Sequence, residues 1–391
     1  MKTIFTILLI SLTTLLLAKD TTPRQELRTI WQKAYGESKK DIAYDSVALK
    51  SGGALIAGMT KSWGHGKSDM LIVKIDKLGN PQFRFTFGGK KNDTARAIVK
   101  TSNGDFVAVG SSDSYTEYGD KDVYVVKFDK NGKKLWGKTY GGERDDEALA
   151  VVATGNGGVI VAGYTESFGQ GYKDGYILYL DKNGKEIWAK AIGGKDDDIL
   201  KGIAFSKTGG FFVTGKTRSF KAEGFDFYLV KFDKHAKYQY RRVLGGDEDD
   251  EFNSIVSTKD GGCAVAGMTK SFESKHSDID VMRFDKNGKV IWHKIFGFKS
   301  KEWANSITTT KEGGFVVAGT TKSFGFGGFD FYLLELNSKG SSIWANVYGA
   351  GDNEMANSVK PLAGGGFLVV GQTESYGKGD YDFMFIKLLK K

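Results

Sequence analysis

The chain has 391 residues, with 56 Lys and Arg against 47 Asp and Glu, a formal charge of +9, and 53 Gly but only 3 Pro. So much glycine indicates many tight turns between short strands, and long helices are not expected. Many lysines recur in turns such as DKNGK beside an Asp, and this even spread argues against a nucleic-acid-binding stripe. The single Cys263 excludes an internal disulfide, and its place in an apolar run predicts a small buried side chain.

The first 20 residues, MKTIFTILLISLTTLLLAKD, combine one early Lys with an apolar run that is short for a membrane span and with the small residue Ala18. This pattern predicts a signal peptide over residues 1–18, followed by a short N-terminal lead over residues 19–27. Leu16 is larger than the residue usual at that position, so an uncleaved anchor is the alternative. After cleavage no stable membrane span is expected, and the protein is expected to be periplasmic or secreted.

From residue 28 onward the chain repeats one unit. The glycine that closes runs such as GGFVVAG recurs at intervals of 52 residues, with one interval of 53, at Gly58, Gly110, Gly163, Gly215, Gly267, Gly319 and Gly371. Each copy holds four short runs rich in β-branched and aromatic residues and bounded by Gly, Asn or Asp, which is typical of strands joined by tight turns. Each unit is therefore predicted to be a four-stranded antiparallel blade. The two central runs are apolar throughout, as in a sheet covered on both faces.

The two ends of the chain complement each other. Internal copies carry an aromatic residue in their fourth run, at Phe83, Trp136, Trp188, Tyr240, Trp292 and Trp344. The last copy lacks this run, whereas RTIWQKAYG, with Trp31, precedes the first copy. Pairing these fragments would close a circle and hide its open edges, whereas a solenoid would need caps. The sequence therefore predicts an all-β, seven-bladed β-propeller over residues 28–391, closed by an N-terminal outer strand on the C-terminal blade.

The repeat also resembles known families. Its plan is similar to that of WD-repeat propellers, although the Gly-His and Trp-Asp signatures are absent. The turns DKNGKKLW, DKNGKEIW and DKNGKVIW resemble the tryptophan-docking motif of quinoprotein-like propellers. That group includes an exported scaffold of outer-membrane protein assembly and quinone-dependent dehydrogenases, which use adjacent cysteines that a chain with one Cys lacks. The whole unit resembles bacterial exported repeat propellers with GGxxVAGxTxSFGxGxxDxxxxKxDxxGxxxW units, and this resemblance implies no established activity.

Two acidic positions recur along the repeat. One opens the third run, at Asp69, Asp122, Asp174, Asp226, Asp278, Asp330 and Asp382. The other follows the link between units, at Asp93, Asp146, Asp198, Asp250, Glu302 and Glu354, with Asp41 as a seventh. The second set could form a carboxylate ring that holds calcium, or each carboxylate could accept hydrogen bonds within its own loop. Because every copy has these residues, a structural role is favoured for both sets. No cofactor is expected, and calcium is left open as the alternative.

Departures from the repeat are the better candidates for ligand contacts. In an antiparallel blade the loop between the second and third strands and the link between blades emerge on the same face. The residues there that depart from the repeat are Trp63, His65, Tyr115, Tyr118, Arg144, His276 and Trp303. Exposed aromatic rings beside carboxylates and hydroxyls suit sugars or extended peptides. The alternative is sequence drift, with the aromatic rings filling gaps between blades.

Catalytic motifs are not evident, because the four histidines lack metal-ligand spacing and no nucleophile motif occurs. The expected function is that of an exported, monomeric, non-catalytic binding or scaffold propeller, which recognises an envelope protein, peptide or glycan but no nucleic acid. One alternative is a polysaccharide hydrolase that uses the pairs Asp145/Asp146 and Asp249/Asp250. The other alternative is a scaffold of the outer-membrane assembly type.

Overall fold

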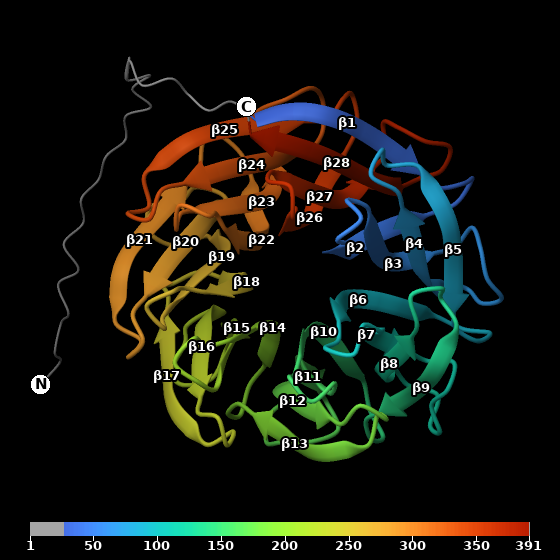
Figure 1. Ribbon diagram of the computed structural model, residues 1–391. Coiled ribbons are helices and arrows are strands. Elements are labelled where there is room, and N and C mark those ends of the chain that lie inside the picture. Colours follow the sequence, from blue (N-terminus) through green and yellow to red (C-terminus); the bar gives the residue numbers. More distant parts are fainter. Residues whose placement is uncertain (1–26, 391) are drawn as a thin grey trace, which may run out of the picture.

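The computed structural model describes residues 27–390, so the expected signal peptide over residues 1–18 lies outside the described residues, as does the expected lead up to residue 26. Residues 27–390 contain 28 strands and no helix. The strands form seven four-stranded antiparallel sheets, arranged as blades around one axis (Figure 1). The predicted all-β, seven-bladed β-propeller is confirmed.

Six of the seven blades run outward from the centre of the ring in the order of the chain, and the seventh takes its outermost strand from the N-terminal end (Figure 1). The innermost strands, which number blades 1 to 7, are β2 (Asp41–Ala48), β6 (Asp93–Lys100), β10 (Asp146–Ala153), β14 (Asp198–Phe205), β18 (Asp250–Ser257), β22 (Glu302–Thr309) and β26 (Glu354–Pro361). The second strands are β3 (Ala54–Thr60), β7 (Phe106–Ser112), β11 (Val159–Thr165), β15 (Phe211–Thr217), β19 (Cys263–Thr269), β23 (Phe315–Thr321) and β27 (Phe367–Thr373).

The outer half of each blade follows the same scheme. The third strands are β4 (Asp69–Ile75), β8 (Asp122–Phe128), β12 (Asp174–Leu180), β16 (Asp226–Phe232), β20 (Asp278–Phe284), β24 (Asp330–Leu336) and β28 (Asp382–Lys390). The outermost strands are β5 (Pro81–Phe87), β9 (Lys134–Tyr140), β13 (Glu186–Ile192), β17 (Tyr238–Leu244), β21 (Val290–Phe296), β25 (Ser342–Tyr348) and, for blade 7, β1 (Leu27–Tyr35).

The two middle strands of each blade form the core. In blade 2 every residue of β7 and β8 is buried, whereas the outermost β9 has no buried residue. Blades stack face to face through aromatic rings such as those of Phe227 and Phe252, whose centroids lie 4.1 Å apart. Cys263 is fully buried as expected, and burial raises the pKa of its thiol. Covering both faces of each sheet explains why these runs are apolar at nearly every position.

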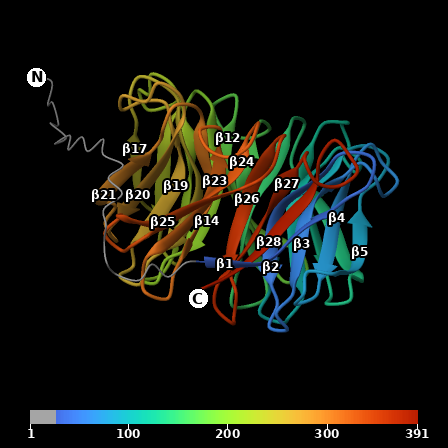
Figure 2. The same ribbon diagram turned by 90° about the horizontal axis from the view of Figure 1, so that it is seen from above.

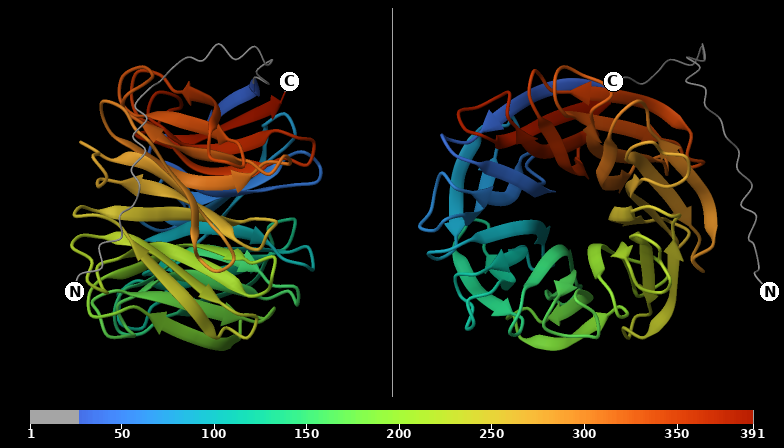
Figure 3. Two further views of the ribbon diagram at one scale, coloured as in Figure 1. Left: turned by 90° about the vertical axis from the view of Figure 1, so that its left-hand side faces the viewer. Right: turned by 180° about the vertical axis from the view of Figure 1, so that it is seen from behind.

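The ring closes through its two ends. β1 pairs antiparallel with β28, with Trp31 opposite Lys387 and Tyr35 opposite Phe383. The two strands lie side by side at the rim (Figure 1 and the right panel of Figure 3). The ring of Trp31 also meets Phe385 edge-on at 5.9 Å. The predicted closure is therefore confirmed.

The aromatic residue of an outermost strand ties its blade to the next one. The indole N–H of Trp31 donates to the carbonyl of Lys77 at 3.3 Å, in the turn of blade 1. Gly79 in that turn has a φ of 77°, and a Cβ there would lie 3.0 Å from the indole, so glycine is required on both counts. Trp136 and Trp292 make the same bond to the next blade at 3.2 and 3.1 Å. The tryptophans of blades 3 and 6 make other contacts: Trp188 stacks on Phe211, and Trp344 donates to Glu335.

The loops between second and third strands share one face with the links between blades, as expected. The backbone N–H of Asp93 donates to the carbonyl of Ser68 at 2.8 Å, which joins the start of β6 to the β3–β4 loop. Lys67 donates to Lys91 at 2.8 Å in the same place. We call the face formed by these loops and links the loop face. Figure 2, a view across the axis, shows the two faces on opposite sides of the strands.

Candidate functional site

The acidic residue that opens each innermost strand is buried and accepts hydrogen bonds from its own surroundings. Asp250 accepts from the backbone N–H of Gly246 at 3.0 Å, from the Ser271 hydroxyl at 2.8 Å and from the Thr269 hydroxyl. Bonds of this kind recur at Asp41, Asp93, Asp146, Asp198, Glu302 and Glu354. Within residues 27–390, no group of three or more His, Cys, Asp or Glu side chains could hold a metal ion. These contacts favour the structural interpretation, and calcium at these carboxylates stays a hypothesis.

In five of the seven blades the aspartate that opens the third strand accepts hydrogen bonds from the loop before it. Asp174 accepts from the backbone N–H groups of Gln170 and Gly171, both at 2.8 Å. Gly193 of the following link lies against this carboxylate, because a Cβ there would come within 2.2 Å of Asp174 and 2.4 Å of Asp198. The same arrangement recurs at Gly36, Gly88, Gly141, Gly245, Gly297 and Gly349. The two acidic positions and the link glycine therefore form one packing unit in each blade.

The structure places the seven ligand-face candidates on the loop face but in three separate groups. Trp63 packs in blade 1 between the Tyr35 ring at 5.3 Å and the Arg84 guanidinium at 4.4 Å, while His65 beside it is exposed. Tyr115, Tyr118 and Arg144 belong to blade 2 and the link that follows it. His276 and Trp303 lie between blades 5 and 6. No single surface of the described chain therefore joins all seven.

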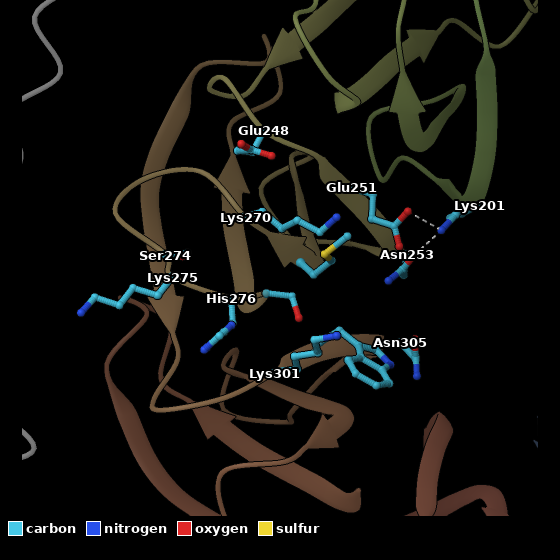
Figure 4. A pocket seen from close by; sticks show the side chains of 13 residues that line it. Lys201, Glu248, Glu251, Asn253, Lys270, Ser274, Lys275, His276, Lys301 and Asn305 are labelled. Carbon is cyan, nitrogen blue, oxygen red and sulfur yellow. Dashed lines mark hydrogen bonds and ion pairs between the residues drawn. The ribbon is translucent and has the colours of Figure 1, made fainter.

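His276 and Trp303 line a cavity of about 630 Å³, which we call the blade 5–6 pocket (Figure 4). Its volume lies in the range typical of ligand sites. The remaining lining residues, which sequence reasoning missed, are Lys201, Glu248, Glu251, Asn253, Met268, Lys270, Ser274, Lys275, Ser277, Lys301 and Asn305. They come from innermost strands, from the second strand β19 (Met268), from the β19–β20 loop and from the links on either side of blade 5.

The inner wall of this pocket is an ionic cluster. Glu251 lies 2.8 Å from the ammonium of Lys201 and 2.9 Å from that of Lys216. Burial raises the pKa of Glu251, but the two ammonium groups outweigh burial and bring its pKa down to about 2. Glu251 is therefore a neutralised carboxylate at neutral pH, and it does not present a free negative charge to a ligand.

The mouth of the blade 5–6 pocket is basic. Lys275, His276 and Lys301 are exposed against one exposed acid, Glu248, and the nearby Asp249 is already paired with Lys270 at 3.0 Å. The half-buried indole of Trp303, held edge-on by Phe329 at 5.0 Å, supplies an apolar wall. This combination suits a ligand that carries both an acidic group and an apolar or sugar surface.

A second cavity, of about 640 Å³, lies between the outer parts of blades 2 and 3, and we call it the blade 2–3 pocket. Two of the expected residues, Tyr115 and Tyr118, line it. The other lining residues are Glu117, Asp122, Thr139, Tyr140, Gly141, Gly142, Phe168, Tyr176, Glu186, Ala189, Lys190 and Ala191. This pocket is acidic and aromatic, in contrast to the basic blade 5–6 pocket.

The four aspartates of the hydrolase alternative all have partners within the protein. Asp146 and Asp250 are buried and accept the Ser167 and Ser271 hydroxyls at 2.7 and 2.8 Å. Asp145 accepts the backbone N–H of Lys121 at 3.0 Å, and Asp249 pairs with Lys270. No contact among the described residues singles out one of them as an acid and another as a base.

Comparison with known proteins fits the fold. No family model matches the chain. The regulatory protein FlaEY of Caulobacter vibrioides is 26% identical over 188 residues, which are 40% of this chain and 19% of FlaEY. The matched segment is therefore about a fifth of that relative's length, and nothing about FlaEY as a whole is transferred.

Several solved structures share the architecture. Chaetomium thermophilum Sqt1, bound to the N-terminus of a ribosomal protein, has a TM-score of 0.52 at 11% identity, over 92% of this chain and 98% of Sqt1. BBS1N in complex with ARL6DN has a TM-score of 0.53 at 11% identity, over 93% of this chain and 97% of BBS1N. The extracellular domain of a B. thetaiotaomicron protein assigned to the hybrid two-component systems has a TM-score of 0.51 at 13% identity, over 90% of this chain and 43% of its own.

At these identities the likeness shows the fold alone. The resemblance to seven-bladed propellers is confirmed at that level, so the chain is a seven-bladed β-propeller. The bacterial exported repeat family, its motif and the location outside the cytoplasm stay predictions. No helix in residues 27–390 has both the length and the apolar character that a membrane crossing needs.

Proposed function

We propose that the protein is a non-catalytic binding module that recognises an envelope protein, peptide or glycan through acidic groups of that partner. The observation that carries this proposal is the blade 5–6 pocket, which joins an indole to a mouth of exposed cations. The solved neighbours include propellers determined with bound protein partners, which supports a binding role for this fold. Export is proposed from the signal-peptide pattern of residues 1–18.

The chemistry of the pocket supports binding more than turnover. Its half-buried carboxylate, Glu251, is held ionised between two ammonium groups, which makes it a poor general acid. Asn305 donates its amide N–H to the Ala356 carbonyl at 2.8 Å, so its orientation is fixed by the next blade. A rigid wall of this kind positions a bound group without offering it a proton.

Titration with two acidic probes, a glutamate-rich peptide and a uronic-acid oligosaccharide, tests this proposal. Lys301→Glu and Trp303→Ala should weaken binding of the preferred probe about 10-fold or more, and added salt should weaken wild-type binding. Trp63→Ala is the matched control, because this indole lies on the same face in blade 1, and binding should be unchanged. Equal affinity for the neutral analogue of each probe would contradict the proposal.

The same samples distinguish the hydrolase alternative. If the oligosaccharide is cleaved, and cleavage is abolished by Asp145→Asn or Asp249→Asn, the protein is an enzyme and the non-catalytic assignment is wrong. An intact oligosaccharide after prolonged incubation with the wild-type protein, together with saturable binding, supports a binding module.

A further inference from the structure

One loop of the ring is a residue longer than its equivalents, and the aspartate that follows it lacks the backbone donors that its copy in blade 3 has. Gly110 precedes Asp122 by 12 positions, whereas Gly163 precedes Asp174 by 11. In blade 3 two backbone N–H groups donate to Asp174. In blade 2 the N–H of Gly119, three residues before Asp122, donates instead to the Thr116 hydroxyl at 3.1 Å. The blade 2 loop therefore does not give Asp122 the two donors that Asp174 receives, and Asp226 of blade 4, after a loop of ordinary length, lacks them as well.

Asp122 is left buried with an unsatisfied oxygen. Its residue surface is 8% exposed, and its Oδ1, which lies against Gly141, is a buried acceptor with no hydrogen-bond partner in the described chain. Both carboxylate oxygens of nearby Asp120 are in the same condition. The Oδ1 atoms of Asp226, Asp330 and Asp382 are also without a partner, but Asp330 and Asp382 accept backbone N–H groups at their other oxygen. Buried acceptors without donors are costly, so a ligand that brings a donor or a positive charge gains the stabilisation that the loop withholds.

Aromatic rings form the walls around this carboxylate. The ring of Tyr115 lies 5.3 Å from that of Tyr124 at a tilt of 47°, and its hydroxyl donates to the carbonyl of Gly88 at 2.5 Å, so its ring is fixed. On the blade 3 side Phe168 stacks on Tyr176 at 5.9 Å. Tyr118 is 61% exposed and stands at the mouth. The faces of such rings attract cations, most strongly where water is excluded.

The charges of the residues that line the pocket also favour a positively charged ligand. Glu117, Asp122 and Glu186 stand against the single cation Lys190 among the residues that line the cavity. Burial, followed by the charges of Asp120, Asp146 and Asp145, raises the pKa of Asp122 to about 7. A positive group would relieve this repulsion, whereas a neutral sugar would leave it in place.

We propose that the blade 2–3 pocket binds an organic cation, an ammonium or guanidinium group, with Asp122 as its counter-ion and the tyrosine rings as its walls. This site goes beyond the proposed function, which rests on the basic pocket of blades 5 and 6. A bare metal ion is disfavoured, because the described residues offer no group of three ligating side chains. The cavity of about 640 Å³ has room for a whole lysine or arginine side chain as well as for a free amine.

Calorimetric titration with two probes of equal shape tests the charge requirement. N-acetyl-arginine methylamide carries the cation, and its citrulline analogue replaces the guanidinium by a neutral urea. The arginine probe should bind at least about 10-fold more tightly, and Asp122→Asn should remove the difference. Equal affinity of the wild-type protein for the two probes, or tighter binding of methyl glucoside than of the arginine probe, would overturn the proposal.

Matched variants separate the pocket from the general stability of the ring. Asp174→Asn changes the same repeat position in blade 3, where two backbone donors satisfy the carboxylate, and should leave the affinity for arginine unchanged. Tyr118→Ala, at an exposed ring that the fold does not need, should weaken binding several-fold. An Asp122→Asn protein that keeps the wild-type preference for arginine would sink the assignment.

Two further measurements are the pH dependence of affinity and a comparison of a peptide with the free amide. Affinity for the arginine probe should rise between pH 5 and pH 8 in the wild-type protein, because Asp122 gains its charge in that range, and should stay flat in Asp122→Asn. A flat wild-type profile would contradict the role of Asp122. A peptide with one central arginine that binds more tightly than the free amide would identify a protein segment as the source of the cation. Equal affinity would identify a small free amine.

Discussion

The two pockets of the loop face are built on one blade template yet have opposite charge. A glutamate at the second position of an innermost strand forms an ionic cluster at two blade junctions: Glu147 with Arg96 and Lys121 between blades 2 and 3, and Glu251 with Lys201 and Lys216 between blades 4 and 5. Of these two glutamates only Glu251 lines a pocket. The strands are alike, so the difference comes from the loops. Glu117, Asp122 and Glu186 make one pocket acidic, whereas Lys275 of the β19–β20 loop and Lys301 of the following link make the other basic.

Both pockets lie in a ring that β1 closes, and removing β1 has the largest expected effect on stability. Deleting residues 27–36 removes β1 together with the Trp31 contact to blade 1. We expect the free energy of unfolding to fall by on the order of 5 kcal/mol, since a buried ladder and an aromatic anchor are lost together. Chemical denaturation followed by tyrosine fluorescence measures this loss. An unchanged midpoint would mean that the rest of the ring is stable without its closing strand.

Breaking the ionic cluster of the blade 5–6 pocket should affect this pocket and leave the blade 2–3 pocket unchanged. Glu251→Gln leaves Lys201 and Lys216 facing each other without a counter-charge, at a cost of about 2–3 kcal/mol at pH 7. The pKa of Glu251 lies near 2 in the folded protein against 4.5 for a free side chain. Its contribution is therefore complete above about pH 4.5 and lost as the pH falls toward 2.

Urea titrations of wild type and Glu251→Gln at pH 7 and pH 3 check this. The difference between the two proteins should shrink at the lower pH. Glu147→Gln is the matched variant, because it breaks the equivalent cluster between blades 2 and 3. It should leave affinity for the acidic probes intact, whereas Glu251→Gln should change it. If both variants changed the same binding property, the two pockets would not be independent.

Asp122→Asn should stabilise the protein at alkaline pH, which Asp174→Asn should not do. Because the pKa of Asp122 is about 7 in the fold against 3.8 in the free side chain, ionisation costs nothing below pH 4. The cost grows as the pH rises from about 4 to 7. We therefore expect a gain on the order of 1 kcal/mol at pH 8 and none at pH 4. Thermal unfolding at both pH values measures it, and a loss of stability at pH 8 would show that Asp122 has donors after all.

Substitutions in the two loops have the smallest expected effect on stability. In the blade 5 loop Glu273 adopts a φ of 70°, a conformation that Gly119 of the blade 2 loop takes with a φ of 84°. Glu273→Gly should raise stability by about 0.5 kcal/mol, and Gly119→Ala should lower it by about 1 kcal/mol. Differential scanning calorimetry resolves both shifts. The same sign for both variants would contradict the strain argument.

The fold could be predicted because its causes are local and repeated. The interval between copies, the apolar middle runs and the complementary ends each follow from the residues, and Trp31 lies where the missing strand required it. The pockets could not be predicted in the same way. The innermost strands contain β-bulges, as between Leu200 and Gly202, where one residue has no partner on the next strand. Such bulges hold Lys201, Asn253 and Asn305, and a single sequence carries no clear signal for them.

The contact between His293 and Asp280 was also not predicted from the sequence. Asp280 is fully buried in β20, at a position where other third strands carry Tyr124, Tyr176 or Tyr332, and its carboxylate contacts the imidazole of His293 on β21. The signal was present, because an acid in an otherwise apolar run needs a partner. Which residue would supply it depended on the register between two strands.

The closing pair has a consequence for the order of events in folding. β1 is the first strand of the ring to leave the ribosome and β28 is the last, yet they are neighbours in the finished sheet. The entropy of closing so long a loop must be overcome before this contact contributes any stability. The remaining blades each complete their four strands from contiguous chain. We therefore expect blade 7 to be the last to assemble, and its edge to stay open to other chains until synthesis is complete.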